Sequence, residues 1–297
     1  MAPVTYYAMG GGLGHLVRAR AVLATLGLES DGHVLSNSVH ARDPRVLGPL
    51  TAHQPPSECA NHPESLAGWV ERKLHELDAN TLFVDVFPGG LLGELTRPLW
   101  KRDTHLCYVG RLLRWQAYRA RLRAPLPRFD HAYLVESLHP DHHAEVASAC
   151  EQVEDLSLND PLSRPSQLLS LPDNTWVVLH SGPAEEVAEL VAYGRDIQAS
   201  EGIEAELRVV GPTNTLAADA LPEFPAVGYF QQATRVITAC GFNVMRQSVG
   251  AVARHHFMPF ARPLDDQFTR AARKRSGEQR RPVEGSTVSP RAGGRQA

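Results

Sequence analysis

Short apolar runs rich in β-branched and aromatic residues alternate along the chain with longer segments whose apolar residues recur at helical spacing. Residues 4–9 predict a strand, and residues 15–26 predict a helix with Leu16, Ala19 and Val22 on one side. Further strands are predicted at 33–36, 81–87, 105–109, 131–135, 176–179, 205–210, 235–238 and 257–260, and further helices at 66–77, 184–197 and 243–249, whereas residues 43–65 are expected to be irregular. This alternation predicts an α/β fold with mostly parallel sheets and right-handed crossovers.

The composition changes between Val153 and Leu171, where Ser, Pro, Asn and Asp replace the periodic pattern. Because such segments connect domains, and 297 residues suffice for two cores, we predict a first domain at 1–157, a hinge at 158–171 and a second domain at 172–275. Residues 276–297 contain few apolar side chains, so a disordered tail is expected there. No C-terminal helix that crosses back to the first domain is expected.

Charge and cysteine usage narrow the classes of function. A formal net charge of -3 argues against nucleic acid as the main partner. The 4 cysteines are scattered without CxxC spacing, which predicts neither a zinc site nor a disulfide framework. The sequence shows no secretory leader and no apolar run long enough to span a membrane, so a cytoplasmic location is expected.

The first predicted strand is followed by a glycine loop that contains Gly11, Gly12 and Gly14. Glycines let the backbone approach a ligand closely, and the N–H groups of the next helix can bind an anion, although plain turns have similar sequences. The dinucleotide-binding fingerprint fits poorly, because the acids that follow, Glu29 and Asp31, lie in a predicted turn. Asp85 ends another predicted strand, where it would either meet a ligand or cap a turn.

Two strand-to-helix turns follow each other between Gln232 and Gln267. The first runs from Ala239 through Gly241, and the second passes through Phe260 to a helix that opens with Asp265 and Asp266. In open α/β sheets ligands bind where strands end and helices begin, because free backbone N–H groups point there. This stretch is therefore predicted to form one wall of a ligand site.

These turns resemble the donor-binding half of GT-B glycosyltransferases, in particular the transferases that use UDP-N-acetylglucosamine in peptidoglycan precursor synthesis. The loop Gly12-Leu13-Gly14-His15 is similar to the first, acceptor-side loop of the same group. The resemblance implies two Rossmann-like domains that face each other across a cleft. Matching positions imply donor contacts from Ser181, Gly182, Gly241, Phe242, Asn243, Gln247, Asp266 and Gln267. Gln247 stands where the family has an acid that holds the ribose hydroxyls.

The implied reaction moves a sugar, N-acetylglucosamine or a similar hexose, from a UDP-type donor to an acceptor hydroxyl with inversion. His15 is the candidate general base, because imidazole titrates near neutral pH. Gly11, Gly12, Gly14, Arg18 and Asp85 are assigned to the acceptor side. No metal or other cofactor is expected, since the chain contains no DxD triplet. The acceptor, whether glycan, lipid-linked or a small molecule, is not encoded.

Two other functions remain open. Some relatives that share a Gly-His-x-x-Arg pattern, here Gly14 to Arg18, hydrolyse the nucleotide sugar with water. A catalytically silent nucleotide-sugar-binding protein is the other, because Gln247 lacks the family's charge. Release of sugar from the donor alone would identify the hydrolase, and binding without turnover would identify the silent protein.

Two charged segments carry alternative interpretations. Residues 111–128 interleave arginines with apolar residues, which suits contact with an anionic membrane surface, binding of an anionic acceptor or, as we favour, an ordinary amphipathic helix packed on the sheet. Residues 139–143 contain three histidines and an acid. Adjacent residues of a helix face different directions, so a metal site is disfavoured there.

Overall fold

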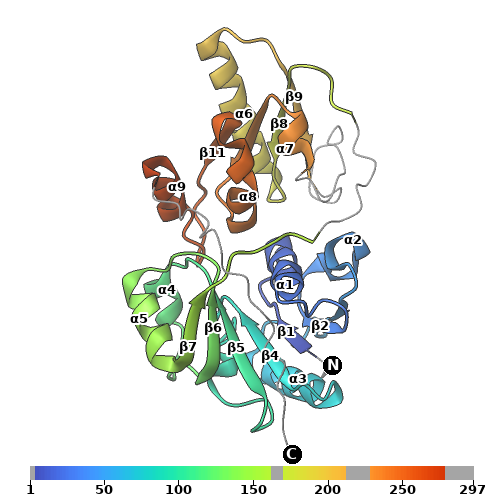
Figure 1. Ribbon diagram of the computed structural model, residues 1–297, viewed down its shortest axis with the longest axis vertical. Helices are drawn as coiled ribbons and strands as arrows, with labels where there is room; N and C mark the ends of the chain where they lie inside the picture. The colour runs from blue at the N-terminus through green and yellow to red at the C-terminus, as the bar shows by residue number, and fades with distance from the viewer. Residues whose placement is uncertain (1–3, 162–169, 212–227, 278–297) are drawn as a thin grey trace, which may run out of the picture.

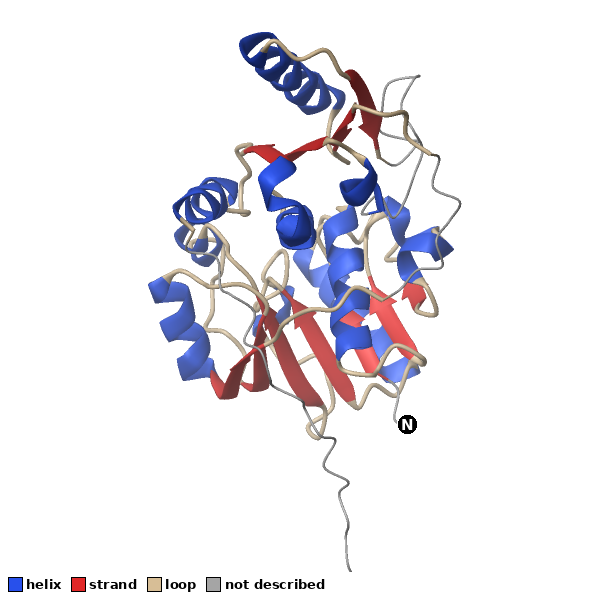
Figure 2. Cartoon of the chain, turned by 45° about the horizontal axis from the view of Figure 1, so that its top comes forward, coloured by secondary structure: helices blue, strands red, loops and turns tan. Residues whose placement is uncertain are grey.

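The computed structural model describes residues 4–161, 170–211 and 228–277, and within them the strands form two separate parallel sheets. The larger sheet has seven strands in the order β3-β2-β1-β4-β5-β6-β7, and the smaller has four in the order β11-β10-β8-β9. Figure 1 shows them as two bodies, one below the other, and Figure 2 shows each group of red strands with blue helices packed against it. The predicted α/β class with parallel sheets is confirmed.

The larger sheet consists of β1 (Val4–Tyr7), β2 (Gly32–Leu35), β3 (Thr51–His53), β4 (Thr81–Asp85), β5 (His105–Gly110), β6 (Phe129–Leu134) and β7 (Cys150–Asp155). Its helices are α1 (Leu13–Thr25), α2 (Pro44–Leu47), α3 (Pro63–Glu76), α4 (Trp115–Arg119) and α5 (Pro140–Ala149), with short 3-10 turns at Val39–Arg42 and Glu94–Thr96. Every pairing within this sheet is parallel.

The smaller sheet consists of β8 (Thr175–Leu179), β9 (Glu206–Val210), β10 (Arg235–Ala239) and β11 (His255–Met258). Its helices are α6 (Ala184–Glu201), α7 (Tyr229–Gln232), α8 (Phe242–Gln247) and α9 (Gln267–Ser276), with a 3-10 segment at Ser248–Arg254. All of the first sheet's strands precede the predicted hinge at 158–171 and all of the second sheet's follow it. Residues 162–169 of that hinge and 278–297 of the predicted tail lie outside the described residues.

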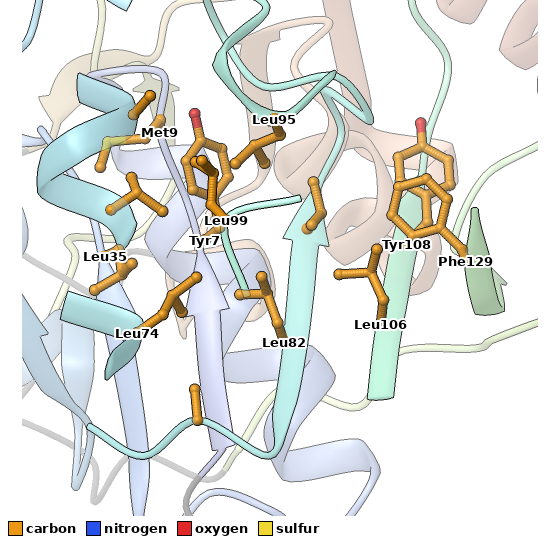
Figure 3. Packing of buried hydrophobic residues seen from close by; sticks show 14 of the residues in the cluster. Tyr7, Met9, Leu35, Leu74, Leu82, Leu95, Leu99, Leu106, Tyr108 and Phe129 are labelled. Carbon is orange, nitrogen blue, oxygen red and sulfur yellow. The ribbon is translucent and has the colours of Figure 1, made fainter. Parts of the chain in front are cut away.

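Two apolar clusters cover the two faces of the larger sheet. Successive side chains of a strand point to opposite faces, so Tyr6 packs in the cluster under α1 and Tyr7 in the cluster under α3. Figure 3 shows the second cluster, which contains Tyr7, Leu82 and Leu106, and in which Tyr108 meets Phe129 with ring centroids 5.5 Å apart. Burial on both faces explains why the central strands are continuous apolar runs.

Three predictions about elements were wrong. Residues 43–65, expected to be irregular, contain α2, β3 and the start of α3. The strand β7 occupies residues that we assigned to the composition change before the hinge. The segment 111–128 forms a helix only at Trp115–Arg119, and its apolar side chains Leu112, Leu113, Trp115, Tyr118 and Leu122 are buried within the protein.

The C-terminal helix also differs from expectation, because α9 does contact the first domain. Arg270 of α9 donates to both carboxylate oxygens of Glu136, at 2.6 and 2.9 Å. Arg273 donates to the carbonyl oxygen of Ser137 at 2.5 Å. Figure 1 shows α9 between the two bodies, above α4 and α5. The chain therefore has a helix near its C-terminus that ties the two sheets together.

Candidate active site

A cavity of about 460 Å³ lies between the two sheets and is lined by residues from both. Its walls are the segments that follow β1, β8 and β10, where each strand ends and the next helix begins. The structure brings the following predicted site residues to this cavity: Gly14, His15, Arg18, Ser181, Gly182, Gly241, Phe242, Asn243, Gln247 and Gln267. The segments are far apart in the sequence and meet only because both sheets point their carboxyl ends at one another.

Four other predicted residues lie outside the cavity lining. Gly11 and Gly12 belong to the exposed loop before α1. Asp85 is fully buried behind His15. Asp266 caps α9, where its carboxylate accepts a hydrogen bond from the backbone N–H of Thr269 at 3.0 Å. Its neighbour Asp265 lines the cavity in its place.

His15 and Asp85 form the central pair of the site. The His15 Nδ1 atom lies 2.6 Å from Asp85 Oδ2 at the cavity wall. Arg18, one helical turn further along α1, donates from Nε to Asp85 Oδ1 at 2.7 Å and from Nη2 to Oδ2 at 2.6 Å. Tyr6 donates its hydroxyl to Oδ1 at 2.9 Å. Four neighbouring contacts thus fix one carboxylate, which in turn fixes the imidazole.

The electrostatics of this pair favour a neutral imidazole beside an ionised carboxylate. Burial lowers the pKa of His15 from its ordinary value of 6.5, although its hydrogen bond and charge interaction with Asp85 act in the opposite direction. Burial alone would raise the pKa of Asp85, but the Arg18 charge and the hydrogen bonds from His15 and Arg18 hold it well below its usual range. A neutral histidine oriented by a carboxylate is the arrangement of a general base.

Gly10 makes room for the imidazole. A Cβ atom on Gly10 would lie 2.2 Å from Nε2 of His15, and its φ of +148° is one that residues with side chains rarely adopt. The backbone N–H groups of Gly10 and Gly11 both donate to the side-chain oxygen of Asn37, at 3.0 and 2.8 Å. The glycine loop therefore serves the placement of His15 and is itself held by Asn37.

Contacts between the domains border the cavity. Asn243, at the start of α8, donates from Nδ2 to the carbonyl oxygen of Gly14 at 2.9 Å, which joins the two predicted loops directly. Arg18 lies over the ring of Phe242 with its guanidinium carbon 5.5 Å from the centroid. Arg246 pairs with Asp160 at 2.6 Å. The predicted acceptor-side and donor-side walls are thus in contact at one edge of the cavity.

The loop before α6 carries a second buried cluster. His180 Nε2 lies 2.7 Å from Glu186 Oε2, and Arg262 pairs with the same carboxylate through both terminal nitrogens. Glu186 occupies the first turn of α6, where it would oppose a bound anion unless it were neutralised. The contact with Arg262 supplies that neutralisation, so the turn at Ser181 and Gly182 can still present N–H groups to an anion.

A third charge cluster joins the end of β5 to α9. Asp265 pairs with Arg111 and, at 3.0 Å, with Arg270. Burial alone would raise the pKa of Asp265, but the charges of Arg111 and Arg270 lower it below its usual range. Gln267 accepts a hydrogen bond from the backbone N–H of Phe260 at 3.0 Å and so fixes the turn that precedes this cluster.

Within residues 4–161, 170–211 and 228–277, no group of three or more His, Cys, Asp or Glu side chains is arranged to hold a metal ion. In the histidine segment 139–143, His142 is buried, stacks on Trp115 with centroids 3.9 Å apart and lies 3.1 Å from the Tyr108 hydroxyl. His139 instead pairs with Asp266 at 2.9 Å. These histidines therefore serve packing and domain contact.

Sequence reasoning missed several cavity residues. They are Arg20, Val46, Asp160, His180 and Arg262, whereas Arg111 and Asp265 lie in predicted segments but were not assigned to the site. His180 directly precedes Ser181, and Arg262 follows Phe260 by two residues. Their nearness in the sequence to these predicted site segments could have identified them as cavity residues. Arg111 and Asp265 are 154 positions apart, and their pairing carries no local signature. None of the helices in the described part of the chain is both long and apolar enough to cross a membrane.

No family model and no curated protein matches the chain. Several solved structures match it. A glycosyltransferase of kitacinnamycin matches with a TM-score of 0.56 and 11% identity, over 93% of this chain and 84% of that one. The spinosyn rhamnosyltransferase SpnG, complexed with thymidine diphosphate, matches with a TM-score of 0.52 and 16% identity, over 92% and 84%.

The glycosyltransferase SnogD from Streptomyces nogalater matches with a TM-score of 0.51 and 11% identity, over 93% of this chain and 85% of that one. The chain has the GT-B fold. Identities this low establish the architecture alone. The architecture includes the two Rossmann-like domains expected from the resemblance. The finer likeness to the peptidoglycan-precursor transferases stays a prediction, and in GT-B terms β1 to β7 form the N-terminal domain.

Proposed function

We propose that this GT-B protein is a glycosyltransferase that moves a hexose from a nucleoside diphosphate sugar to an acceptor hydroxyl with inversion. The observation that supports this most directly is the 2.6 Å contact between His15 and Asp85 at the wall of a cavity lined by both domains. A neutral base stands on one side, and two strand-to-helix turns that suit a diphosphate stand on the other.

In this proposal Nε2 of His15 accepts the proton of the acceptor hydroxyl while the oxygen attacks the anomeric carbon. The bond between that carbon and the phosphate oxygen breaks, and the nucleoside diphosphate leaves with the electron pair. Asp85 and Arg18 are positioning residues, since they act through His15. The carboxylate keeps Nδ1 protonated and stabilises the imidazolium that forms.

The leaving group gains charge on its phosphate oxygens, so stabilising that charge is usually a large catalytic term. We assign this role to backbone N–H groups at the turns of Ser181 and Gly182 and of Gly241 to Asn243. Gln247 and Gln267 line the same cavity and are proposed donor contacts. We propose that no metal takes part, because the cavity acids Asp160 and Asp265 are in ion pairs with arginines.

The donor base is the least constrained part of the proposal. UDP follows from the sequence resemblance, with N-acetylglucosamine or a similar hexose as the sugar. Thymidine diphosphate is the nucleotide named for the SpnG complex. Both nucleotides belong in any test, and the acceptor has to be found by screening hydroxyl compounds.

The decisive test is the variant His15→Ala, compared with His143→Ala, in which an exposed histidine of α5 is removed. Loss of a general base typically lowers turnover by about 10²–10⁴-fold, and nucleoside diphosphate binding should persist. His143→Ala should match the unmodified protein in both. Equal turnover in all three proteins would remove His15 from the mechanism, and sugar release from the donor without acceptor would identify a hydrolase instead.

A further inference from the structure

The structure places four arginines among the described residues that line the cavity, and they differ in how their guanidinium groups are used. Arg18 donates hydrogen bonds to Asp85 from Nε and Nη2. Arg262 donates hydrogen bonds to Glu186 from Nη1 and Nη2. Arg20 donates from Nε to Glu29 at 2.8 Å and from Nη1 to a backbone carbonyl. Each of these three arginines donates hydrogen bonds from two of its guanidinium nitrogens.

Arg111 is the exception. It is only 7% exposed, and both of its hydrogen bonds start from Nη1, one to the carbonyl oxygen of Leu112 at 3.0 Å and one to Asp265. Its Nε atom is buried without a hydrogen-bond partner, and Nη2 donates to no residue within the described ranges. The edge of a guanidinium that carries Nε and Nη2 is one of its two faces for binding a carboxylate or phosphate with parallel hydrogen bonds.

The charge of Arg111 is also incompletely balanced. Its one acidic partner, Asp265, is shared with Arg270, whose Nη2 donates to the same oxygen at 3.0 Å. Burial lowers the pKa of Arg111, the charges of Asp265 and Glu136 act in the opposite direction, and those of Arg18 and Arg270 lower it further. A buried cation with free donors is costly unless a partner arrives.

We propose that Arg111 is a ligand-binding residue whose Nε–Nη2 edge donates paired hydrogen bonds to an anionic group of the molecule that occupies the cavity. This inference rests on the proposed function, since it names a chemical group of that reaction's substrates. The anion is a phosphate of the sugar donor or a carboxylate of the acceptor, since each presents two charged oxygens that can accept parallel hydrogen bonds from a guanidinium. Because Arg111 and His15 line the same cavity, the anion would share that cavity with the reacting atoms.

A purely structural role would look different. If Arg111 served only to join the domains, its bond to Asp265 would be its whole contribution, and a ligand would leave its free edge unchanged. Asp265 keeps the contact with Arg270 when Arg111 is replaced, so Arg111→Met is expected to fold. Arg111→Lys keeps the positive charge but removes the planar guanidinium that can donate two parallel hydrogen bonds. Arg119→Met is the matched control, because Arg119 pairs with Glu145 outside the cavity lining.

The experiment follows the Nε–H resonance of Arg111 in protein labelled with ¹⁵N-arginine, assigned by its loss in Arg111→Lys. Inorganic pyrophosphate, UDP, TDP and benzoate are titrated separately into the full chain. We expect a saturable shift of this resonance, and at least a tenfold weaker dissociation constant for the same titrant in Arg111→Met but not in Arg119→Met. Partial retention of affinity in Arg111→Lys is expected, since one point charge remains.

The titrants separate the two sources of the anion. A shift with pyrophosphate and the nucleotides assigns Arg111 to the donor phosphates, and a shift with benzoate alone assigns it to an acceptor carboxylate. An unmoved resonance with all four, or equal affinities in the methionine variant, overturns the inference. If UDP or TDP binds while the resonance stays unmoved, only the inference about Arg111 fails, whereas absence of any nucleotide binding counts against the proposed function itself.

Discussion

The residues around His15, the proposed general base, each contribute to its position or its charge. Asp85 is the acceptor that orients the ring, Arg18 keeps that acceptor ionised, and Gly10 leaves the space that Nε2 requires. The sequence pointed to His15, Arg18 and Asp85 separately, through a motif and a strand end. Their mutual distances depend on β1 and β4 being neighbours in the sheet, which a single sequence does not reveal.

The acid limb of the pH profile tests this arrangement. If His15 is the base it must be neutral, and burial lowers its pKa below 6.5, so the active form persists below that pH and is lost as pH falls through the lowered pKa. We therefore expect kcat/KM to fall to half of its plateau value at a pH below 6.5. The measurement is a pH–rate profile with buffers of constant ionic strength.

The sign of the effect makes the prediction specific. An exposed histidine with an ordinary pKa would give a half-maximal rate at about pH 6.5. Such a profile would contradict the buried neutral pair. Far-ultraviolet circular dichroism at each pH serves as the control, since it shows that any decline reports on ionisation and not on unfolding.

At the scale of elements, the hydrophobic pattern predicted the buried strands of the larger sheet well and its edge strands poorly. The central strands β1, β4 and β5 are apolar because helices cover both of their faces. The edge strand β3 is Thr-Ala-His, and the opposite edge, β7, is almost entirely exposed, with the sequence CEQVED. Edge strands pair along one side only and bury little, so polar residues are tolerated and the periodic signal disappears.

The helix α9 gives a prediction at the same scale. Arg270 is 2% exposed and bonds to Glu136, Asp265 and the carbonyl oxygen of Cys240. Replacing it by methionine leaves the partly buried carboxylate of Glu136 without its main partner, so we expect a loss of about 3 kcal/mol in the free energy of unfolding. Urea denaturation followed by tryptophan fluorescence measures this loss.

The control for α9 is a surface pair. Arg119 and Glu145 have side chains that are 36% and 30% exposed, and such pairs contribute about 0–1 kcal/mol. Arg119→Met should therefore change the unfolding midpoint little. If both variants lost the same stability, α9 would not be the clamp between domains that its contacts indicate.

At the scale of the whole molecule, the cavity exists only because two independently formed sheets face each other. The pairs that hold them there, Arg246 with Asp160 and Arg111 with Asp265, join residues 86 and 154 positions apart. Charged residues at such separations have no periodic or motif signature, so sequence reasoning identified the two loops but not the contacts that bring them together. The resemblance to GT-B enzymes supplied this information, because it implied two domains that face each other across a cleft.

A thermal-shift panel tests this composite site directly. A ligand that binds only the folded protein stabilises it by about 2.7 kcal/mol at 100 times its dissociation constant. We expect UDP or TDP to raise the melting temperature increasingly with concentration, and GDP and ADP to do so less, because one base should fit the pocket best. His15→Ala should retain the shift, since the proposed base is not required for nucleotide binding.

Glycine variants show whether the nucleotide lies at the α6 turn. A Cβ on Gly182 would lie 2.2 Å from Nε2 of His180 and 2.9 Å from Glu186, so Gly182→Ala must displace the cluster at this turn and should reduce the nucleotide-induced shift. Gly68→Ala is the matched control, because there the nearest atom, on Arg72, is 3.6 Å away. Equal shifts in both variants would place the nucleotide elsewhere. No shift with any nucleotide in the unmodified protein would mean that the GT-B fold serves another ligand here, since a fold alone does not determine what its cleft binds.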